Sequence, residues 1–387
     1  MTAEFRAALE ELGRINGDIS PRLIARLSSG DPEDVAWFRD HFGDLDAAVR
    51  AATLAAMVES AETDYELDYG ELYRVALEDN SPDVRRRAVE GLWEDERLDL
   101  IRRLLALLEN DASDEVRAAA ATSLGRFVYM AECDLVDGDR AMRLRAALLR
   151  AVAEQSLDVA RRALESLAYI NDESVTRLID QAYAHDHPLM RQSAVFAMGR
   201  SADRFWSETV LAELHSDDAA MRFEAARAAG ELRLPRALPV LARLVARDRD
   251  AEVQSMAIWA LGEIGGRRAR EILERLAEGD DEAQSVAAHE ALEAMDLGSP
   301  EFDMFIFEPE EGAEYVPAHI HSGDASGDAP DPDEDESLEE HEEEDLEDDS
   351  LPGYRREFER YTDEDDDSDE DDDENDDDWI DEFLELT

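Results

Sequence analysis

The residues whose spacing most resembles a metal-ligand set lie in an acidic segment late in the sequence. Asp331, Asp333, Asp335 and Glu342 occupy positions 1, 3, 5 and 12 of a twelve-residue calcium-binding loop. Position 6, where such a loop needs Gly for its sharp turn, is Glu336. No helical pattern flanks the segment, so we interpret it as a solvated acidic run and predict no calcium site.

Two further sets of residues could act as metal ligands or nucleophiles. His319 and His321 have the spacing of a zinc-binding pair, but two histidines in so polar a stretch are more often simply polar residues. Cys133, the single cysteine, belongs to no nucleophile motif, and we find no glycine-rich phosphate loop and no paired-histidine zinc helix. We therefore predict no catalytic residue, no metal and no cofactor, and a protein that is not an enzyme.

Arginine recurs at one position of a repeated helical phrase. The five arginines are Arg85, Arg117, Arg161, Arg191 and Arg222. One interpretation is structural, with each guanidinium pairing with an aspartate or a carbonyl oxygen of the neighbouring repeat. The other is a row of cations on a concave face that binds carboxylates of a partner or of the chain's own tail. Both interpretations stay open, and we take the five as candidate partner-binding residues.

The extreme C-terminus carries a second candidate set within an otherwise acidic stretch. Its large apolar residues are Trp379, Ile380, Phe383, Leu384 and Leu386. On a helix they would form a stripe that can lie in a hydrophobic groove, which is how many recognition peptides bind. We predict a recognition peptide; docking in the chain's own groove, or no role, are the alternatives.

The amino-acid composition indicates the salt conditions in which these residues act. All 39 basic residues are Arg, against 100 acidic residues, and the net charge is −61. This balance predicts an extreme halophile as the source, because carboxylates and guanidinium groups keep a surface hydrated in molar salt. At about 1 M salt the Debye length is roughly 3 Å, so recognition must work at contact.

The same balance argues against two classes of partner and predicts a compartment. Nucleic-acid binding would require a basic patch, which this chain lacks, so we predict no nucleic-acid partner. No apolar stretch approaches the roughly 18 residues of a membrane span, and we predict no membrane partner. A single cysteine fits a reducing compartment, so we expect a cytoplasmic protein.

The elements that position these residues are helices that repeat along the chain. A phrase with a leading apolar residue and Ala four positions later returns with leading positions 49, 84, 116, 159, 190, 221, 253 and 283. Most intervals are near 31 residues, which is room for two helices and two short turns. One helical hairpin cannot bury its own apolar face, so the hairpins must stack. The sequence predicts an all-α fold, a right-handed α-solenoid of about eight hairpins.

Local signals predict where these helices begin and end. Asp83, Asp114 and Asp158 stand where an N-cap residue belongs. Glycines are expected at helix ends, and those that fit are Gly125, Gly199, Gly262 and Gly265. The longest interval between repeats contains residues 131–140, which we predict to form a protruding loop.

One segment resembles a known family. Residues 248–292, DRDAEVQSMAIWALGEIGGRRAREILERLAEGDDEAQSVAAHEAL, closely resemble the HEAT-like repeats of the phycobilin-lyase (PBS lyase) type, and similar phrases cover most of residues 46–297. The resemblance implies a fold and a mode of use, that of a scaffold or adaptor that binds proteins. We match no residue to a bilin site. The resemblance extends to accessory factors of taxis and motility in haloarchaea, and it implies a signalling assembly as one setting.

The domain organisation follows from these patterns. Residues 1–45 are predicted to be an N-terminal helical cap or degenerate repeat, and residues 46–297 the solenoid. Residues 298–320 are predicted to be a C-terminal capping segment or, alternatively, a partner-binding peptide. Residues 321–387 form an acidic tail that cannot bury enough apolar area to order, so we predict disorder.

The predicted function is that of a non-catalytic adaptor that uses the concave face and the tail peptide. One alternative is a subunit of a lyase-like or protein-modifying enzyme complex, which a bound chromophore would favour. Another is an acidic-tail protein that occupies a basic partner, which strong salt screening disfavours.

Overall fold

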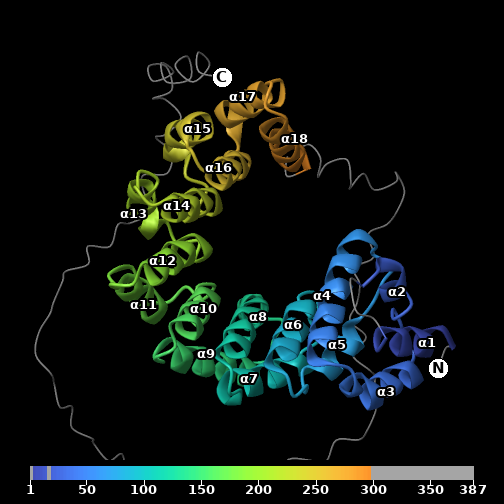
Figure 1. Cartoon of the computed structure of the whole chain (residues 1–387). Coiled ribbons are helices and arrows are strands. Elements are labelled where there is room, and N and C mark those ends of the chain that lie inside the picture. Colours follow the sequence, from blue (N-terminus) through green and yellow to red (C-terminus); the bar gives the residue numbers. More distant parts are fainter. Residues whose placement is uncertain (1–2, 15–18, 298–387) are drawn as a thin grey trace, which may run out of the picture. The chain divides into compact units, whose positions relative to one another are not determined.

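The computed structural model describes residues 3–14 and 19–297. These residues form helices and no strand, arranged as successive hairpins, so the predicted all-α solenoid of HEAT-like hairpins is confirmed (Figure 1). The predictions for residues 298–320, for the acidic tail and for Trp379, Ile380, Phe383, Leu384 and Leu386 lie outside the described residues. No described helix is both long enough and apolar enough to cross a bilayer.

Each hairpin consists of a first helix and a second helix. The first helices are α3 (Pro32–His41), α5 (Gly70–Ala76), α7 (Asp99–Asn110), α9 (Gly138–Val152), α11 (Glu173–Tyr183), α13 (Ser207–Glu213), α15 (Leu238–Arg247) and α17 (Gly266–Ala277). The second helices are α4 (Ala47–Thr63), α6 (Pro82–Gly91), α8 (Asp114–Glu132), α10 (Leu157–Leu167), α12 (Pro188–Arg200), α14 (Ala219–Glu231), α16 (Ala251–Ile264) and α18 (Glu282–Leu297).

The N-terminal segment continues the same two layers. A shorter pair of helices, α1 (Ala3–Leu12) and α2 (Pro21–Ala25), precedes α3, and a 3-10 turn (Phe42–Asp44) joins α3 to α4. Helix α1 packs on α3, and α2 packs on α4. The first helix of the first full hairpin therefore lies before residue 45.

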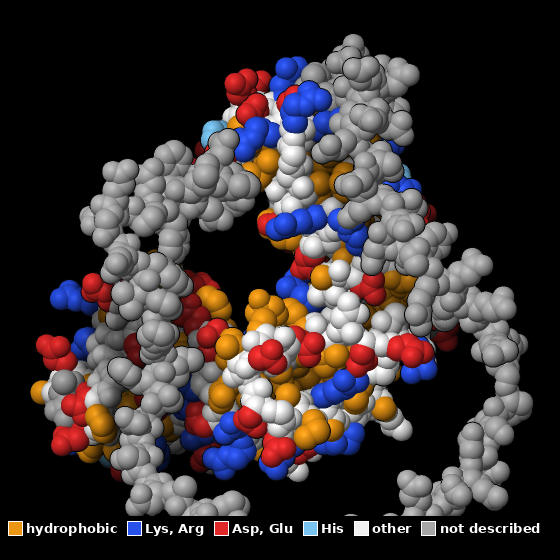
Figure 2. Space-filling model, turned by 180° about the vertical axis from the view of Figure 1, so that it is seen from behind, with side chains coloured by type: hydrophobic (Ala, Val, Ile, Leu, Met, Phe, Trp, Pro, Cys, Tyr) orange, Lys and Arg blue, Asp and Glu red, His pale blue; other side chains and the backbone are white. Residues whose placement is uncertain are grey.

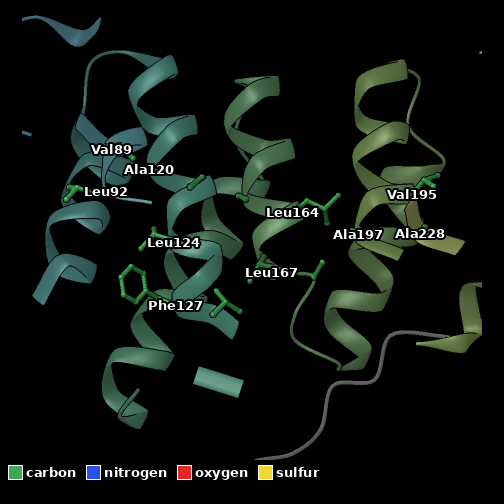
Figure 3. Packing of buried hydrophobic residues seen from close by; sticks show 14 of the residues in the cluster. Val89, Leu92, Ala120, Leu124, Phe127, Leu164, Leu167, Val195, Ala197 and Ala228 are labelled. Atoms are coloured by element: carbon green, nitrogen blue, oxygen red, sulfur yellow. The ribbon is translucent and has the colours of Figure 1, made fainter. Parts of the chain in front are cut away.

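The first helices form because their apolar residues recur at helical spacing on one face. In α7 the buried residues are Leu100, Ile101, Leu104 and Leu108, with arginines and a glutamate on the remaining faces. In the middle of the array the second helices α8, α10, α12 and α14 bury more residues, because each packs against its own first helix and against the second helices on both sides. Figure 3 shows Leu124 and Phe127 of α8 and Leu164 of α10 within this shared core.

The second helices pack on one another at every step of the array, from α2 to α18. Among the first helices, sparser contacts join α1 to α3, α3 to α5, α7 to α9, and α15 to α17. In Figure 1 the second helices from α8 to α16 lie along the inner side of this run and the first helices along its outer side. We call the surface of the second helices that faces away from the first helices the inner surface.

Three of the four glycines predicted to end helices do not do so. Gly125, Gly199 and Gly262 lie within α8, α12 and α16. A Cβ atom on Gly199 would lie 2.6 Å from the Cα atom of Ala228 on the next second helix. These glycines are therefore sites of close helix approach. Gly265 does end α16, with the positive φ of 69° that favours glycine.

The predicted N-caps are displaced by one or two residues. The aspartates lie in the first turns of α6, α8 and α10, where a negative charge stabilises the helix through its dipole. The residues at the N-cap positions are Ser81, Ser113 and Ser156.

The prediction that residues 131–140 form a protruding loop is also wrong. The extra residues lengthen α8 to 19 residues and α9 to 15, so only residues 133–137 lie between the two helices. The apolar positions of α8 continue through the buried Val128, which keeps the chain helical past the usual end of a second helix.

Candidate partner-binding surface

Two of the predicted arginines form matching ion pairs with the following hairpin. The Nε and Nη2 atoms of Arg85 donate to the two carboxylate oxygens of Asp111, at 2.7 and 2.8 Å. Its Nη1 atom donates to the carbonyl oxygen of Asp79 at 2.7 Å. Asp111 lies in the turn before α8, so the pair ties the second helix of one hairpin to the turn of the next.

Arg222 repeats this geometry four hairpins after Arg85. Its Nε and Nη2 atoms donate to Asp248 at 2.7 and 2.8 Å, and its Nη1 atom donates to the carbonyl oxygen of Ser216 at 2.8 Å. The hydrogen bonds from Arg222 lower the pKa of the Asp248 carboxyl, whose side chain is only 3% exposed. Arg50 makes the corresponding pair with Asp79.

The other three arginines keep the location but change the partner. Arg117 donates to the carbonyl oxygen of Leu108 at 2.9 Å and pairs with Glu154. Arg161 donates to the hydroxyl of Ser193 at 3.1 Å, and Arg191 donates to the carbonyl oxygens of His185 and Asp186 at 3.0 and 2.9 Å. The five guanidinium groups are thus engaged within the chain, but only Arg85 and Arg222 pair with an aspartate of the neighbouring hairpin as the structural interpretation predicted. A partner-binding role for them stays a prediction.

A different set of side chains occupies the middle of the inner surface. The guanidinium carbon of Arg227, on α14, lies 4.2 Å from the ring centre of Phe196 on α12. Arg200 lies 5.3 Å from the same ring, and both arginines pair with Glu231, at 3.1 Å from Arg200 and 3.2 Å from Arg227. Tyr169, in the turn that follows α10, extends this series toward α8, because its ring lies 5.3 Å from the guanidinium of Arg200. Cations thus alternate with aromatic rings from the end of α10 across α12 to α14.

A buried carboxylate network borders this series on α10 and α12. Glu165 accepts a hydrogen bond from Arg162 at 2.7 Å and from the hydroxyl of Ser193 at 2.5 Å. Its side chain is 8% exposed, so an isolated charge there would be costly. Arg161 lies 3.8 Å away on the same helix and adds a second positive charge.

Glu224 of α14 has no such compensation. One of its carboxylate oxygens is buried and has no hydrogen-bond partner among the described residues. The pKa of Glu224 is raised to about 7, mainly by burial; the positive charges of Arg227 and Arg161 oppose the shift, and the negative charges of Glu165 and Glu231 add to it. The carboxyl therefore changes charge close to neutral pH.

Exposed apolar side chains accompany these charged groups on the second helices. Tyr129 on α8 is 55% exposed and stacks at a tilt with Tyr169, at 5.5 Å between ring centres, while Trp259 on α16 is 38% exposed. Figure 2 shows basic, acidic and apolar side chains interleaved over the described surface that it presents. Such a mixture suits the binding of protein side chains. No group of potential metal ligands occurs among residues 3–14 and 19–297.

The side chains in the middle of the inner surface were not predicted from the sequence, because the predicted candidates were the arginines near the leading apolar residue of each second helix. The residues of the surface lie further along each second helix, six and ten positions after that residue. At six positions they include Phe196, Arg227 and Trp259, and at ten positions Tyr169, Arg200 and Glu231. Aligning the repeats and examining the non-apolar columns would have revealed this series.

Comparisons with known proteins support the fold. The family model described as HEAT repeats matches residues 71–153 and 207–295. No curated protein sequence matches the chain. Similar solved structures include YibA from Escherichia coli, at 16% identity with a TM-score of 0.38, over 76% of this chain and 98% of the other.

Two further solved structures have similar scores. The complex of CpcE and CpcF of phycocyanin lyase from Nostoc is 20% identical with a TM-score of 0.40, over 73% of this chain and 96% of the other. Human deoxyhypusine hydroxylase is 18% identical with a TM-score of 0.31, over 76% and 96%. At these scores the likenesses carry no argument about what this chain does.

Proposed function

We propose that this chain is a non-catalytic adaptor that holds a protein partner on its inner surface. The observation that carries the proposal is the row of cations and aromatic rings formed by Tyr169, Phe196, Arg200 and Arg227. Arg and aromatic residues dominate the binding energy of protein interfaces, because they bury large areas and make directional polar contacts. HEAT-repeat proteins commonly bind proteins, which supports the same assignment.

The setting of this function is part of the proposal. The absence of Lys and the net charge of −61 support a haloarchaeal source and a salt-rich cytoplasm. Contact pairs between guanidinium and carboxylate groups keep most of their strength there, since screening acts mainly beyond the Debye length. A signalling or taxis assembly is the setting that we propose for the partner, and the tail peptide supplies a second contact to it.

The test is a capture experiment from the native host at high salt with matched variants of the full chain. The inner variant carries Tyr129→Ser, Trp259→Ser and Val286→Ser, at side chains that are 55%, 38% and 53% exposed. The outer variant carries Tyr65→Ser, Met142→Ser and Phe205→Ser, at side chains that are 93%, 65% and 64% exposed. We expect mass spectrometry to find one partner with the wild type and the outer variant but not with the inner variant. Loss from the outer variant alone would contradict the proposal.

A further inference from the structure

A pocket of about 560 Å³ opens on the inner surface between α6 and α8, with Arg162 of α10 at its border. Its wall is mainly apolar and includes Val89, Ala118 and Ala119. Trp93 stands at its rim with 59% of the side chain exposed. A large exposed indole beside an aliphatic wall is the kind of site that takes a bulky apolar side chain.

Arg126 gives this pocket a guanidinium group that lies 4.8 Å from the Phe127 ring and has two donors left unsatisfied within the described part of the chain. Its Nη1 atom donates to the carbonyl oxygen of Trp93 at 2.6 Å. Its Nε and Nη2 atoms are buried and have no hydrogen-bond partner among the described residues. Burial lowers the pKa of Arg126, and the negative charges of Asp95 and Glu96 only partly oppose the shift. Unsatisfied donors on a buried cation are costly, and a carboxylate supplied by a ligand would remove that cost.

The other two arginines of the pocket differ in this respect. Arg86 pairs with Glu90 at 2.5 Å, and Arg162 pairs with Glu165 at 2.7 Å. The pocket therefore has one vacant cationic position at Arg126, next to an apolar wall and an exposed indole. The chemistry that fits is a peptide in which a carboxylate stands beside large apolar residues.

The end of this chain has that chemistry. Residues 379–387 read WIDEFLELT, so Asp381, Glu382 and Glu385 alternate with Trp, Ile, Phe and Leu. Residues 298–378 connect this peptide to α18. A random-coil chain of that length would have a root-mean-square span of about 50 Å, and tethering over such a span gives an effective concentration in the millimolar range.

We propose that the pocket between α6 and α8 binds residues 379–387 of the same chain, with one of their carboxylates on Arg126 and their apolar side chains against Trp93 and Val89. The proposal goes beyond the adaptor function, because it gives the peptide an internal binding site and leaves the rest of the inner surface, with Tyr129, Trp259 and Val286, to the partner. A bound partner that also contacts the peptide would have to displace it.

The test measures binding of a synthetic fluorescent peptide of residues 376–387 to the full chain by fluorescence anisotropy. The tail-silenced chain carries Trp379→Ser, Phe383→Ser and Leu384→Ser. These substitutions remove the large apolar side chains of the peptide, so its own tail should no longer occupy the pocket. We expect the peptide to bind this chain at least about tenfold more tightly than the wild type, whose own tail competes. Equal binding to both would overturn the proposal.

Substitutions in the pocket identify the site. In the tail-silenced background, Arg126→Gln should weaken peptide binding about tenfold or more, since a hydrogen bond to a charged group is lost. Arg243→Gln is the matched control, because Arg243 lies exposed on α15 and, among the described residues, donates to the carbonyl oxygen of Pro239 alone. Unchanged affinity in Arg126→Gln would overturn the proposal, as would an equal loss in Arg243→Gln.

Two measurements separate the remaining possibilities. A peptide with Asp381→Asn, Glu382→Gln and Glu385→Gln should bind at least about tenfold more weakly, and this arm does not depend on the folding of any pocket variant.

Sedimentation of the wild type and the tail-silenced chain should give the same monomer mass. A larger mass that the tail substitutions abolish would show that the peptide binds a second copy, which overturns docking within one chain. The capture experiment with the inner variant can succeed or fail independently of these results, because it leaves Arg126, Trp93 and the tail intact.

Discussion

At the scale of single residues, the ion pairs between hairpins combine a nearly buried carboxylate with a guanidinium that saturates both of its oxygens. Asp248 is the clearest example, since Arg222 approaches both oxygens and the backbone N–H of Asp250 donates to one of them at 3.0 Å. Removing the arginine leaves a buried charge with little compensation, and such losses are large.

We therefore expect Arg222→Met to lower the free energy of unfolding by about 3 kcal/mol at neutral pH. Urea denaturation measures the change, with Arg243→Met as a surface control that should shift stability by less than about 0.5 kcal/mol. The stabilisation from a lowered Asp248 pKa is present above the unfolded-state pKa of about 4 and is lost as the pH falls through the folded-state value. The difference between wild type and variant should therefore shrink in acid, and a constant difference would argue against the pair.

Glu224 shows the opposite dependence on pH. Its folded-state pKa is about 7, above the ordinary value of 4.5, so the folded chain binds the proton more tightly than the unfolded chain. Stability should therefore fall as the pH rises from about 5 to 7. Glu224→Gln should remove this loss and raise the free energy of unfolding by about 1–2 kcal/mol at pH 8. Thermal unfolding at pH 5 and pH 8 measures the effect, and equal shifts at the two values would contradict it.

At the scale of elements, the second helices depend on small residues where they cross. Gly199 lies against Ala228, Gly230 lies against Ala260, and Gly125 lies against Ser166, whose hydroxyl donates to the carbonyl oxygen of Ala121 at 2.8 Å. An alanine normally stabilises a helix relative to glycine by roughly 1 kcal/mol. Close approach reverses that preference at these positions.

Two Gly→Ala substitutions test the expected sign of the change in the free energy of unfolding. Gly199→Ala should destabilise the chain by about 2 kcal/mol, because the new methyl group would overlap the backbone of α14. Gly138→Ala, at the start of α9 with nothing within 4 Å of the added methyl group, should be neutral or slightly stabilising. Chemical denaturation of the pair measures both, and stabilisation by Gly199→Ala would disprove the packing argument.

The helices themselves were largely predictable from the sequence. The predicted leading residues are buried through the middle of the array, at Val84, Val116, Val159, Met190, Met221 and Val253. They are only half-buried at Val49 and exposed at Ala283, near the ends. Glycine and aspartate were assigned by their local preferences, whereas contacts with the next hairpin decided the role of Gly125 and Gly199. The series at Phe196 and Arg227 was equally hidden, because it depends on which side chains of different repeats meet.

At the scale of the whole molecule, the net charge of −61 opposes compaction at low salt. We expect the melting temperature to rise as KCl increases from 0.1 to 2 M. The coupling energy between Arg222 and Asp248, from a double-mutant cycle, should change by less than about 0.5 kcal/mol, because the pair is at contact and largely shielded from salt. A coupling energy that vanishes in 2 M KCl would mean that the ion pair is effectively solvent-exposed.

The unequal packing of the two helix layers has a mechanical consequence. The second helices contact one another at every step, and a glycine allows a close approach at α8–α10, α12–α14, α14–α16 and α16–α18, so their layer resists stretching. The first helices are joined less continuously. The array should then bend most easily by opening gaps between neighbouring first helices, while the second helices keep their contacts and act as the hinge. The pitch between Tyr169, Phe196 and Arg227 would be conserved while the array flexes. A partner would therefore find these side chains at a constant spacing while the array bends.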